Sequence, residues 1–260
     1  MKKIVSLCLV LCLAVALFAG CETVTAAVEI AEALDKTRAL DSIDAEIVTK
    51  LTMSAEGKSE TMRSTVHMQA DGLKSDSPKL SIQSETAGQG YTGNTHIYLE
   101  DQGAYYTLYS FHYKMKIDDA GDETDYTEAV TELMQDIPAE LLKNVKLEKQ
   151  ADGSRTVTIT LTDEQLSEIF EETVEGITDE LGSDLDDLVV NNAKVTIAIK
   201  DGYVTKYALQ YHVSVEAMGI KMEADAEVSV ALKNPGSKVT ATPPEGYKDF
   251  PDWSNLGGIG

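Results

Sequence analysis

The side chains most able to do chemistry in this chain are three cysteines and four histidines. No two histidines have the His-Glu-x-x-His or related spacing that puts zinc ligands on one face of a helix. There is also no Gly-x-Ser-x-Gly nucleophile motif, no Walker loop, and no Gly-x-Gly-x-x-Gly turn leading from a strand into a helix. The sequence therefore predicts that the protein is not an enzyme and has no metal site and no cofactor.

The cysteines lie within and directly after a segment that has the layout of a secretory signal. Residues 1–20 begin with two lysines after the first methionine, continue with an apolar run at residues 4–18 and end with small residues before Cys21. The run is short for a bilayer span, which needs about 20 residues. Residues 17–21, Leu-Phe-Ala-Gly-Cys, resemble a bacterial lipobox, in which the cysteine is diacylated and becomes the first residue of the mature chain.

The resemblance implies that residues 1–20 are a lipoprotein signal peptide and that Cys21 is the lipidation site. Two acyl chains give stable membrane attachment, whereas one is marginal. We therefore expect an extracytoplasmic protein that is lipid-anchored to the membrane of a bacterium. Two alternatives stay open: a plain secretory signal with an incidental cysteine, and an uncleaved anchor. A mature chain that keeps Cys21 alone has no intrachain disulfide and no thiolate metal cluster.

The charge of the chain excludes one class of partner. There are 22 basic and 44 acidic residues, which give a formal net charge of −22. Such a surface repels phosphate backbones, so we expect no nucleic-acid binding. The acidic run at residues 118–125 offers oxygen ligands for calcium. It lacks the alternating Asp-x-Asp-x-Asp-Gly spacing of a calcium loop, which favours a solvated loop.

Alternation of apolar and polar residues predicts antiparallel strands with one buried face. Short turns such as Asp152-Gly153 and Asp201-Gly202 predict hairpins between successive strands. The Gly-rich segment 87–94 predicts a loop. The strands are expected at residues 43–53, 61–70, 79–86, 95–100, 104–110, 111–117, 144–150, 155–161, 192–200, 203–217 and 220–232.

Helical spacing of apolar residues predicts helices at residues 25–40, 126–137, 138–144 and 163–181. The last of these begins with a capping box, in which Gln165 follows the capping Thr162 by three residues. Strands and helices do not alternate as βαβ units, so the fold class is α+β: a large curved antiparallel sheet with helices packed on one face. Residues 21–260 are expected to form a single domain with an irregular tail from about residue 234.

The order of elements resembles that of the LolA/LolB and LppX/LprG lipoproteins and of the uncharacterised Gram-positive lipoproteins near them. It consists of an anchored cysteine, an Ala-rich helix, long hairpins, mid-chain helices, a capped helix and a final three-stranded meander. In those families a half-open antiparallel barrel wraps helices, and the space between them holds acyl chains. The resemblance implies a half-open barrel with an apolar cleft between sheet and helices.

The predicted function is binding or shuttling of an apolar or amphiphilic ligand, such as a lipid, in that cleft. The alternative is an envelope module with a solid core that binds a protein or a wall polymer. Sequence parity does not separate a lined cleft from a packed core. The aromatic run at residues 104–113 has two explanations, a platform for sugars or peptides and cross-strand pairs. The candidate cleft residues are Met53, Met62, Met68, Leu166, Phe170, Val174, Tyr207, Tyr211 and Met222.

Overall fold

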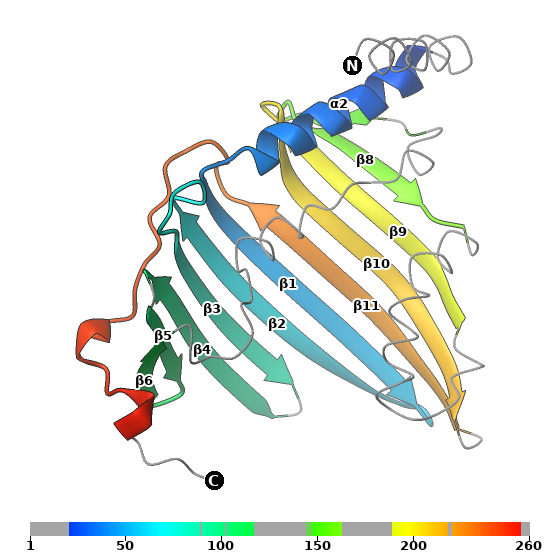
Figure 1. The fold of residues 1–260 in the computed structure, drawn as a ribbon. Coiled ribbons are helices and arrows are strands. Elements are labelled where there is room, and N and C mark those ends of the chain that lie inside the picture. The colour runs from blue at the N-terminus through cyan, green and yellow to red at the C-terminus, as the bar shows by residue number, and fades with distance from the viewer. Residues whose placement is uncertain are drawn as a thin grey trace, which may run out of the picture.

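One open antiparallel sheet dominates the protein (Figure 1). A computed structural model describes residues 21–88, 90–101, 103–116, 145, 147–162, 189–217 and 220–255. Its 11 strands follow the order β6-β5-β4-β3-β2-β1-β11-β10-β9-β8-β7. The strands are β1 (Ser42–Ala55), β2 (Lys58–Asp71), β3 (Lys79–Gly88), β4 (Tyr91–Glu100), β5 (Gly103–Leu108), β6 (Phe111–Lys116), β7 (Leu147–Lys149), β8 (Arg155–Thr160), β9 (Val189–Lys200), β10 (Tyr203–Ala217) and β11 (Ile220–Leu232).

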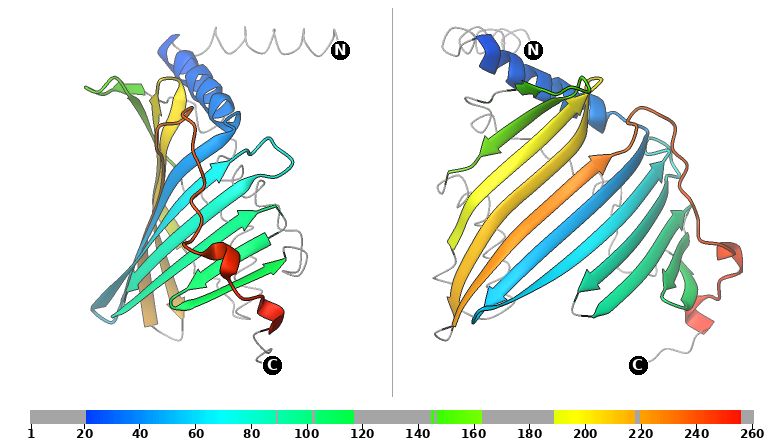
Figure 2. Two further views of the ribbon diagram at one scale, coloured as in Figure 1. Left: turned by 90° about the vertical axis from the view of Figure 1, so that its left-hand side faces the viewer. Right: turned by 180° about the vertical axis from the view of Figure 1, so that it is seen from behind.

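Two meanders make up this sheet, one from β1 to β6 and one from β7 to β11. Within each meander, every strand pairs with the strand that follows it in sequence. The meanders are joined where β1 pairs with β11, from Ala45 opposite Leu232 to Ala55 opposite Met222. Figure 2 shows that the sheet is curved and twisted. The predicted large curved antiparallel sheet is therefore confirmed, and it is not closed, because β6 and β7 lie at opposite edges.

The sheet has one apolar face and one polar face, as the alternation predicts. Cross-strand pairs such as Ala45–Met68 and Ile82–Ile97 lie on the apolar face. Two buried clusters form on it, one beneath the helix and one over the first meander. The first cluster contains Ala26, Ile30, Ala33, Leu34, Val145, Val157, Ile159, Leu161, Ala193, Val195, Ile197, Ile199 and Val204. The second contains Ile43, Ala45, Met68, Ala70, Leu80, Leu99 and Ala104.

Helix α2 (Cys21–Arg38) lies across one end of the sheet, next to β8, β9 and β10 (Figures 1 and 2). It confirms the helix predicted at residues 25–40 with a shifted start and end. Its buried residues include Ile30, which packs in the first cluster, whereas Val28 points outward and is 51% exposed. It is the single α-helix among the described ranges, so packing of helices on one face is seen for this helix alone. The helices predicted at 126–137, 138–144 and 163–181 lie outside the described residues.

Two predicted details are wrong. The loop predicted at residues 87–94 is too long: β3 extends to Gly88 and β4 begins at Tyr91, with Ala87 opposite Thr92. The chain turns between these two strands, where Gly90 has a φ of 79°, a backbone conformation that glycine adopts readily. In β10 the predicted stripe places Tyr203 on the same face as Tyr207. A bulge between Val204 and Lys206 changes the parity, and Val204 is the residue that enters the first cluster.

Thr37 fastens α2 to the second meander. Its side chain is fully buried, and its hydroxyl Oγ1 donates to the carbonyl of Ala33 at 2.6 Å. The same oxygen accepts the main-chain N–H of Val204 at 2.9 Å. The ladder between β10 and β11 begins only at Lys206, so this buried N–H of Val204 lies before its first pair and needs another acceptor. The helix therefore supplies a polar group that the sheet requires.

We expect Thr37→Val to destabilise the protein by about 1–3 kcal/mol, because a buried N–H loses its acceptor. The measurement is urea denaturation of the full chain, followed by circular dichroism. Thr37→Ser is the matched control, since it keeps the hydroxyl and removes only a methyl group, at about 0.8 kcal/mol. Equal denaturation midpoints for Thr37→Val and wild type would contradict this role.

Candidate functional site

Three exposed methionines lie on the apolar face, at the end of the sheet remote from α2. Met53, Met62 and Met222 are 39%, 38% and 41% exposed. They share one face because Leu51 lies opposite Met62 and Ala55 lies opposite Met222. We call these three residues the methionine rim. Large exposed apolar side chains that gather on one surface mark an interaction site more often than isolated ones do.

Exposure rises steadily along the apolar face towards this rim. On β1, Ala45 is fully buried, Leu51 is half-buried and Met53 is exposed. On β2, Met68 is 6% exposed and Met62 is 38% exposed. The face is thus a filled core at the α2 end and an open apolar surface at the other. An apolar surface open at one end can receive an apolar ligand without rearrangement of the core.

Glycine gives Met62 room on this surface. A Cβ atom on Gly88, the cross-strand neighbour of Met62, would lie 3.0 Å from Met62 Cγ. A side chain at position 88 would therefore crowd Met62. Methionine is unbranched and polarizable, so it adapts to ligands of irregular shape.

The remaining predicted cleft residues lie in other places. Met68 belongs to the second buried cluster, and Tyr207 and Tyr211 pack against the first. Burial raises the pKa of the Tyr207 phenol, which agrees with an apolar environment. Cys21 is the first residue of α2. The rim therefore brings together three of the nine predicted residues, and Leu166, Phe170 and Val174 lie outside the described residues.

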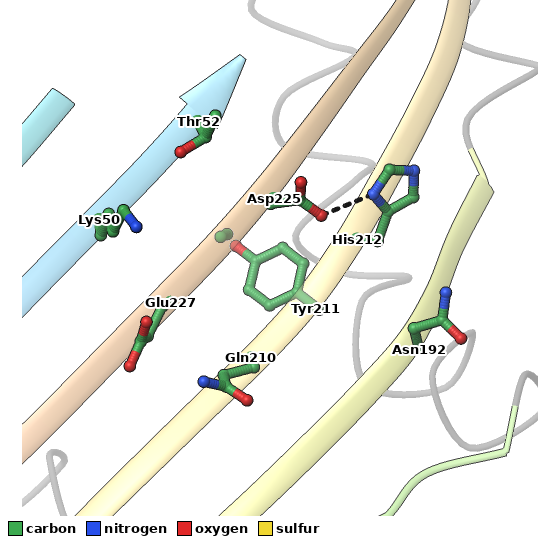
Figure 3. Close-up of a pocket in the computed structure, with 9 residues that line it drawn as sticks. Lys50, Thr52, Asn192, Gln210, Tyr211, His212, Asp225 and Glu227 are labelled. Carbon is green, nitrogen blue, oxygen red and sulfur yellow. Dashed lines mark hydrogen bonds and ion pairs between the residues drawn. The ribbon is translucent and has the colours of Figure 1, made fainter. Parts of the chain in front are cut away.

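A hollow of about 310 Å³ lies on the polar face, across β1, β11, β10 and β9 (Figure 3). His212 Nδ1 lies 2.8 Å from Asp225 Oδ1, and Lys50 is directly opposite Glu227. The first is a cross-strand hydrogen-bonded pair and the second is a cross-strand pair of opposite charge, and both kinds of pair stabilise a sheet. Among the described residues, no group of three or more His, Cys, Asp or Glu side chains is arranged to hold a metal ion. The hollow is hydrophilic and does not suit an apolar ligand.

No motif in the sequence indicates this hollow, although the alternation correctly predicts that His212 lies on the polar face. Its shape depends on the twist of the sheet and on a bulge in β9, where the register shifts between Gln210 and His212. At this bulge Asn192 has a φ of 55°. Asparagine tolerates this backbone conformation better than most residues.

A second hollow, of about 320 Å³, lies on the polar face beside the C-terminal tail and includes His67 and His96. His96 Nε2–H donates to the carbonyl of Thr242 at 3.2 Å and lies 2.9 Å from Ser81 Oγ. The N–H of Thr242 in turn donates to Gln69 at 3.2 Å. The tail therefore crosses the polar face along β2, β3 and β4.

The aromatic run at residues 104–113 forms cross-strand pairs. Tyr106 and Tyr113 are direct neighbours on β5 and β6, with stacked rings 4.9 Å apart. Tyr98 and Tyr105 are neighbours on β4 and β5, with ring centroids 6.1 Å apart. Of the two explanations for this run, the structure supports pairing between strands.

The amino-acid sequence matches the model of one protein family over most of its length. A model of DUF6612, a family of unknown function, matches residues 26–237. The chain belongs to the DUF6612 family. Residues 238–255 of the tail lie beyond this match. A search of curated proteins found no match.

Three solved structures that are similar to this chain have low sequence identity to it. LprF from Mycobacterium bovis is 11% identical, with 85% of this chain and 97% of LprF covered and a TM-score of 0.44. The S-type phycobiliprotein lyase CPES from Guillardia theta is 9% identical, with coverages of 80% and 97% and a TM-score of 0.22. A beta-barrel-like protein of the domain of unknown function DUF1849 from Brucella abortus is 10% identical, with coverages of 75% and 100% and a TM-score of 0.19. Within the described ranges, the helices lack the length and apolar character that crossing a bilayer requires.

His96 should make the stability of the protein depend on pH. Burial lowers the pKa of its imidazole below the usual value of 6.5, and the hydrogen bond to Thr242 opposes part of this shift. Neutral His96 then contributes stability that is complete above pH 6.5 and is lost as the pH falls through the folded-state pKa.

We expect the free energy of unfolding to fall less steeply between about pH 7 and pH 5 in His96→Gln than in wild type, because the group that titrates has been removed. Urea denaturation at several pH values measures both slopes. Identical slopes would show that His96 does not contribute.

Proposed function

We propose that this protein is a membrane-anchored extracytoplasmic lipoprotein that binds an apolar or amphiphilic ligand, such as a lipid. The observation that carries the proposal is the methionine rim, which leaves one end of the apolar face exposed while α2 covers the other. The attachment is proposed from residues 17–21, which resemble a lipobox with Cys21 as the acylated residue.

The proposed binding is passive. The apolar part of the ligand covers the methionine rim, and each Å² of apolar surface removed from water contributes about 25 cal/mol. The apolar stripe predicted for residues 163–181, with Leu166, Phe170 and Val174, is proposed as the facing wall of the cleft. The polar part of an amphiphilic ligand stays at the open end, in contact with water. The role includes no catalytic step and needs no cofactor.

The rim predicts a specific loss of binding. We expect the triple variant Met53→Gln, Met62→Gln, Met222→Gln to bind a dansyl-labelled fatty acid at least about tenfold more weakly than wild type, which corresponds to about 1.4 kcal/mol. The reason is that the variant replaces apolar contact surface with amides that must be desolvated. Fluorescence titration of the purified chain from residue 21 onward measures the Kd.

Val28→Gln is the matched control, because Val28 is also an exposed apolar residue but lies on α2. This variant should bind the probe as wild type does. If wild type takes up no probe and native mass spectrometry detects no co-purified lipid, the ligand-binding proposal is wrong, and the solid-core interaction module becomes the better explanation.

The attachment is tested separately. In a bacterial host, we expect Cys21→Ala to abolish incorporation of a radiolabelled fatty acid, because no thiol remains for acylation. The variant should accumulate as an uncleaved precursor or in the medium. Gel fluorography and cell fractionation measure both outcomes. A processed, acylated product from the variant would contradict the role of Cys21.

A further inference from the structure

The C-terminal tail covers the free edge of β6, the outermost strand on one side of the sheet (Figures 1 and 2). The main-chain N–H of Lys114 donates to the carbonyl of Pro251 at 2.9 Å. Lys114 also forms a parallel bridge with Asp252. An edge strand presents N–H and C=O groups that can pair with another extended chain. The tail therefore lies where an added strand would bind.

Two aromatic side chains of the tail hold β6 from both faces. The ring of Phe250 is 5.1 Å from that of His112, and the ring of Trp253 is 4.8 Å from that of Tyr113. Successive residues of a strand point to opposite faces. Phe250 therefore packs on the polar face and is 7% exposed, whereas Trp253 packs on the apolar face. The segment Phe-Pro-Asp-Trp, residues 250–253, therefore contacts both faces of β6 at the edge of the sheet.

A third aromatic residue fixes the tail just before this contact. The hydroxyl of Tyr247 donates to Glu100 Oε2 at 2.7 Å. Its ring meets those of Tyr98 and Tyr105 edge-on, with centroids 5.2 and 4.9 Å away. Such edge-to-face pairs are favourable beyond the area they bury.

The chemistry of the two partners is complementary. β6 carries Lys114 and Lys116, and the tail segment carries Asp249 and Asp252. The segment consists of two short 3-10 helices, Tyr247–Asp249 and Trp253–Asn255, joined by an extended stretch. It resembles a bound peptide more than a strand of the sheet. It also lies beyond residue 237, where the family match ends.

We propose that the edge of β6 is a binding site for an extended protein segment of the type aromatic–Pro–Asp–aromatic, and that the chain's own tail occupies this site as an intramolecular competitor. The partner segment adds to β6 by main-chain hydrogen bonds and places its aromatic residues where Phe250 and Trp253 lie. Tethering gives the tail an effective concentration on the order of millimolar. A partner segment therefore displaces the tail only if it binds β6 more tightly than the tail does, or is present at a higher local concentration. This site is distinct from the methionine rim and does not depend on lipid binding.

The test uses a fluorescein-labelled peptide of residues 245–255 and the chain from residue 21 onward. In Phe250→Ala, Trp253→Ala the competitor is weakened, so we expect saturable binding with an apparent Kd at least about tenfold lower than that of wild type. Fluorescence anisotropy measures both. A peptide whose Phe and Trp are replaced by Ala should not bind. Adding Lys114→Glu to the double variant should weaken binding of the original peptide, because it puts a negative charge beside Asp252 of the peptide.

Circular dichroism verifies that the double variant is folded. If it is not, Trp253→Ala alone replaces it, because Trp253 is 48% exposed and its loss costs the fold less. Equal binding of the peptide by wild type and variant, or no binding by either, would overturn the proposal. The proposal would also be overturned if the variant self-associates in sedimentation velocity and does not bind the peptide. The tail would then serve only to protect an edge strand from pairing with other chains.

Discussion

The pairing of β1 with β11 is the constraint on which the rest of the structure depends. Among the described strands, every other ladder joins neighbours in sequence, so either meander could form by local folding. Only the β1–β11 ladder brings the two ends of the strand sequence together. Its register must be correct residue by residue, because a shift of one residue would turn every apolar side chain of one meander to the polar face. The shared apolar face, and with it the rim formed by Met53 of β1 and Met222 of β11, exists only in this register.

The two ends of the apolar face are stabilised differently. At one end, α2 fills the face and also supplies the hydroxyl of Thr37 to the main-chain N–H of Val204, which lies before the first pair of the β10–β11 ladder. At the other end, the described residues leave methionines partly in water. The buried apolar side chains are therefore concentrated at the helix end, whereas the ladder hydrogen bonds continue to the other end. The open end keeps exposed apolar surface, which is the energetic condition for binding an apolar ligand.

Much of this sheet could be predicted from the sequence, because its determinants are local. Alternation identified the buried face of each long strand, and turns such as Asp201-Gly202 identified hairpins. The pairing of β1 with β11 could not be predicted, because alternation shows which face of a strand is buried and does not show which strand lies beside it. The glycines of segment 87–94 concealed strand residues, and the extra residue at Thr205 changed a parity that a sequence pattern assumes to be constant. The rim shows the same limit: alternation puts its methionines on the apolar face, but their exposure depends on where the helix ends.

Helix α2 begins at Cys21 and continues directly into the packed end of the sheet. An acyl chain on that cysteine would leave no flexible tether between bilayer and fold. The domain would then have a fixed polarity: its filled end near the membrane and its receptive end at the far side of the sheet (Figure 1). The methionine rim, where we propose that the ligand binds, would then lie at a height above the lipid surface set by the length of the strands. Under the proposed attachment and ligand binding, the methionine rim would face other proteins of the envelope rather than the bilayer beneath.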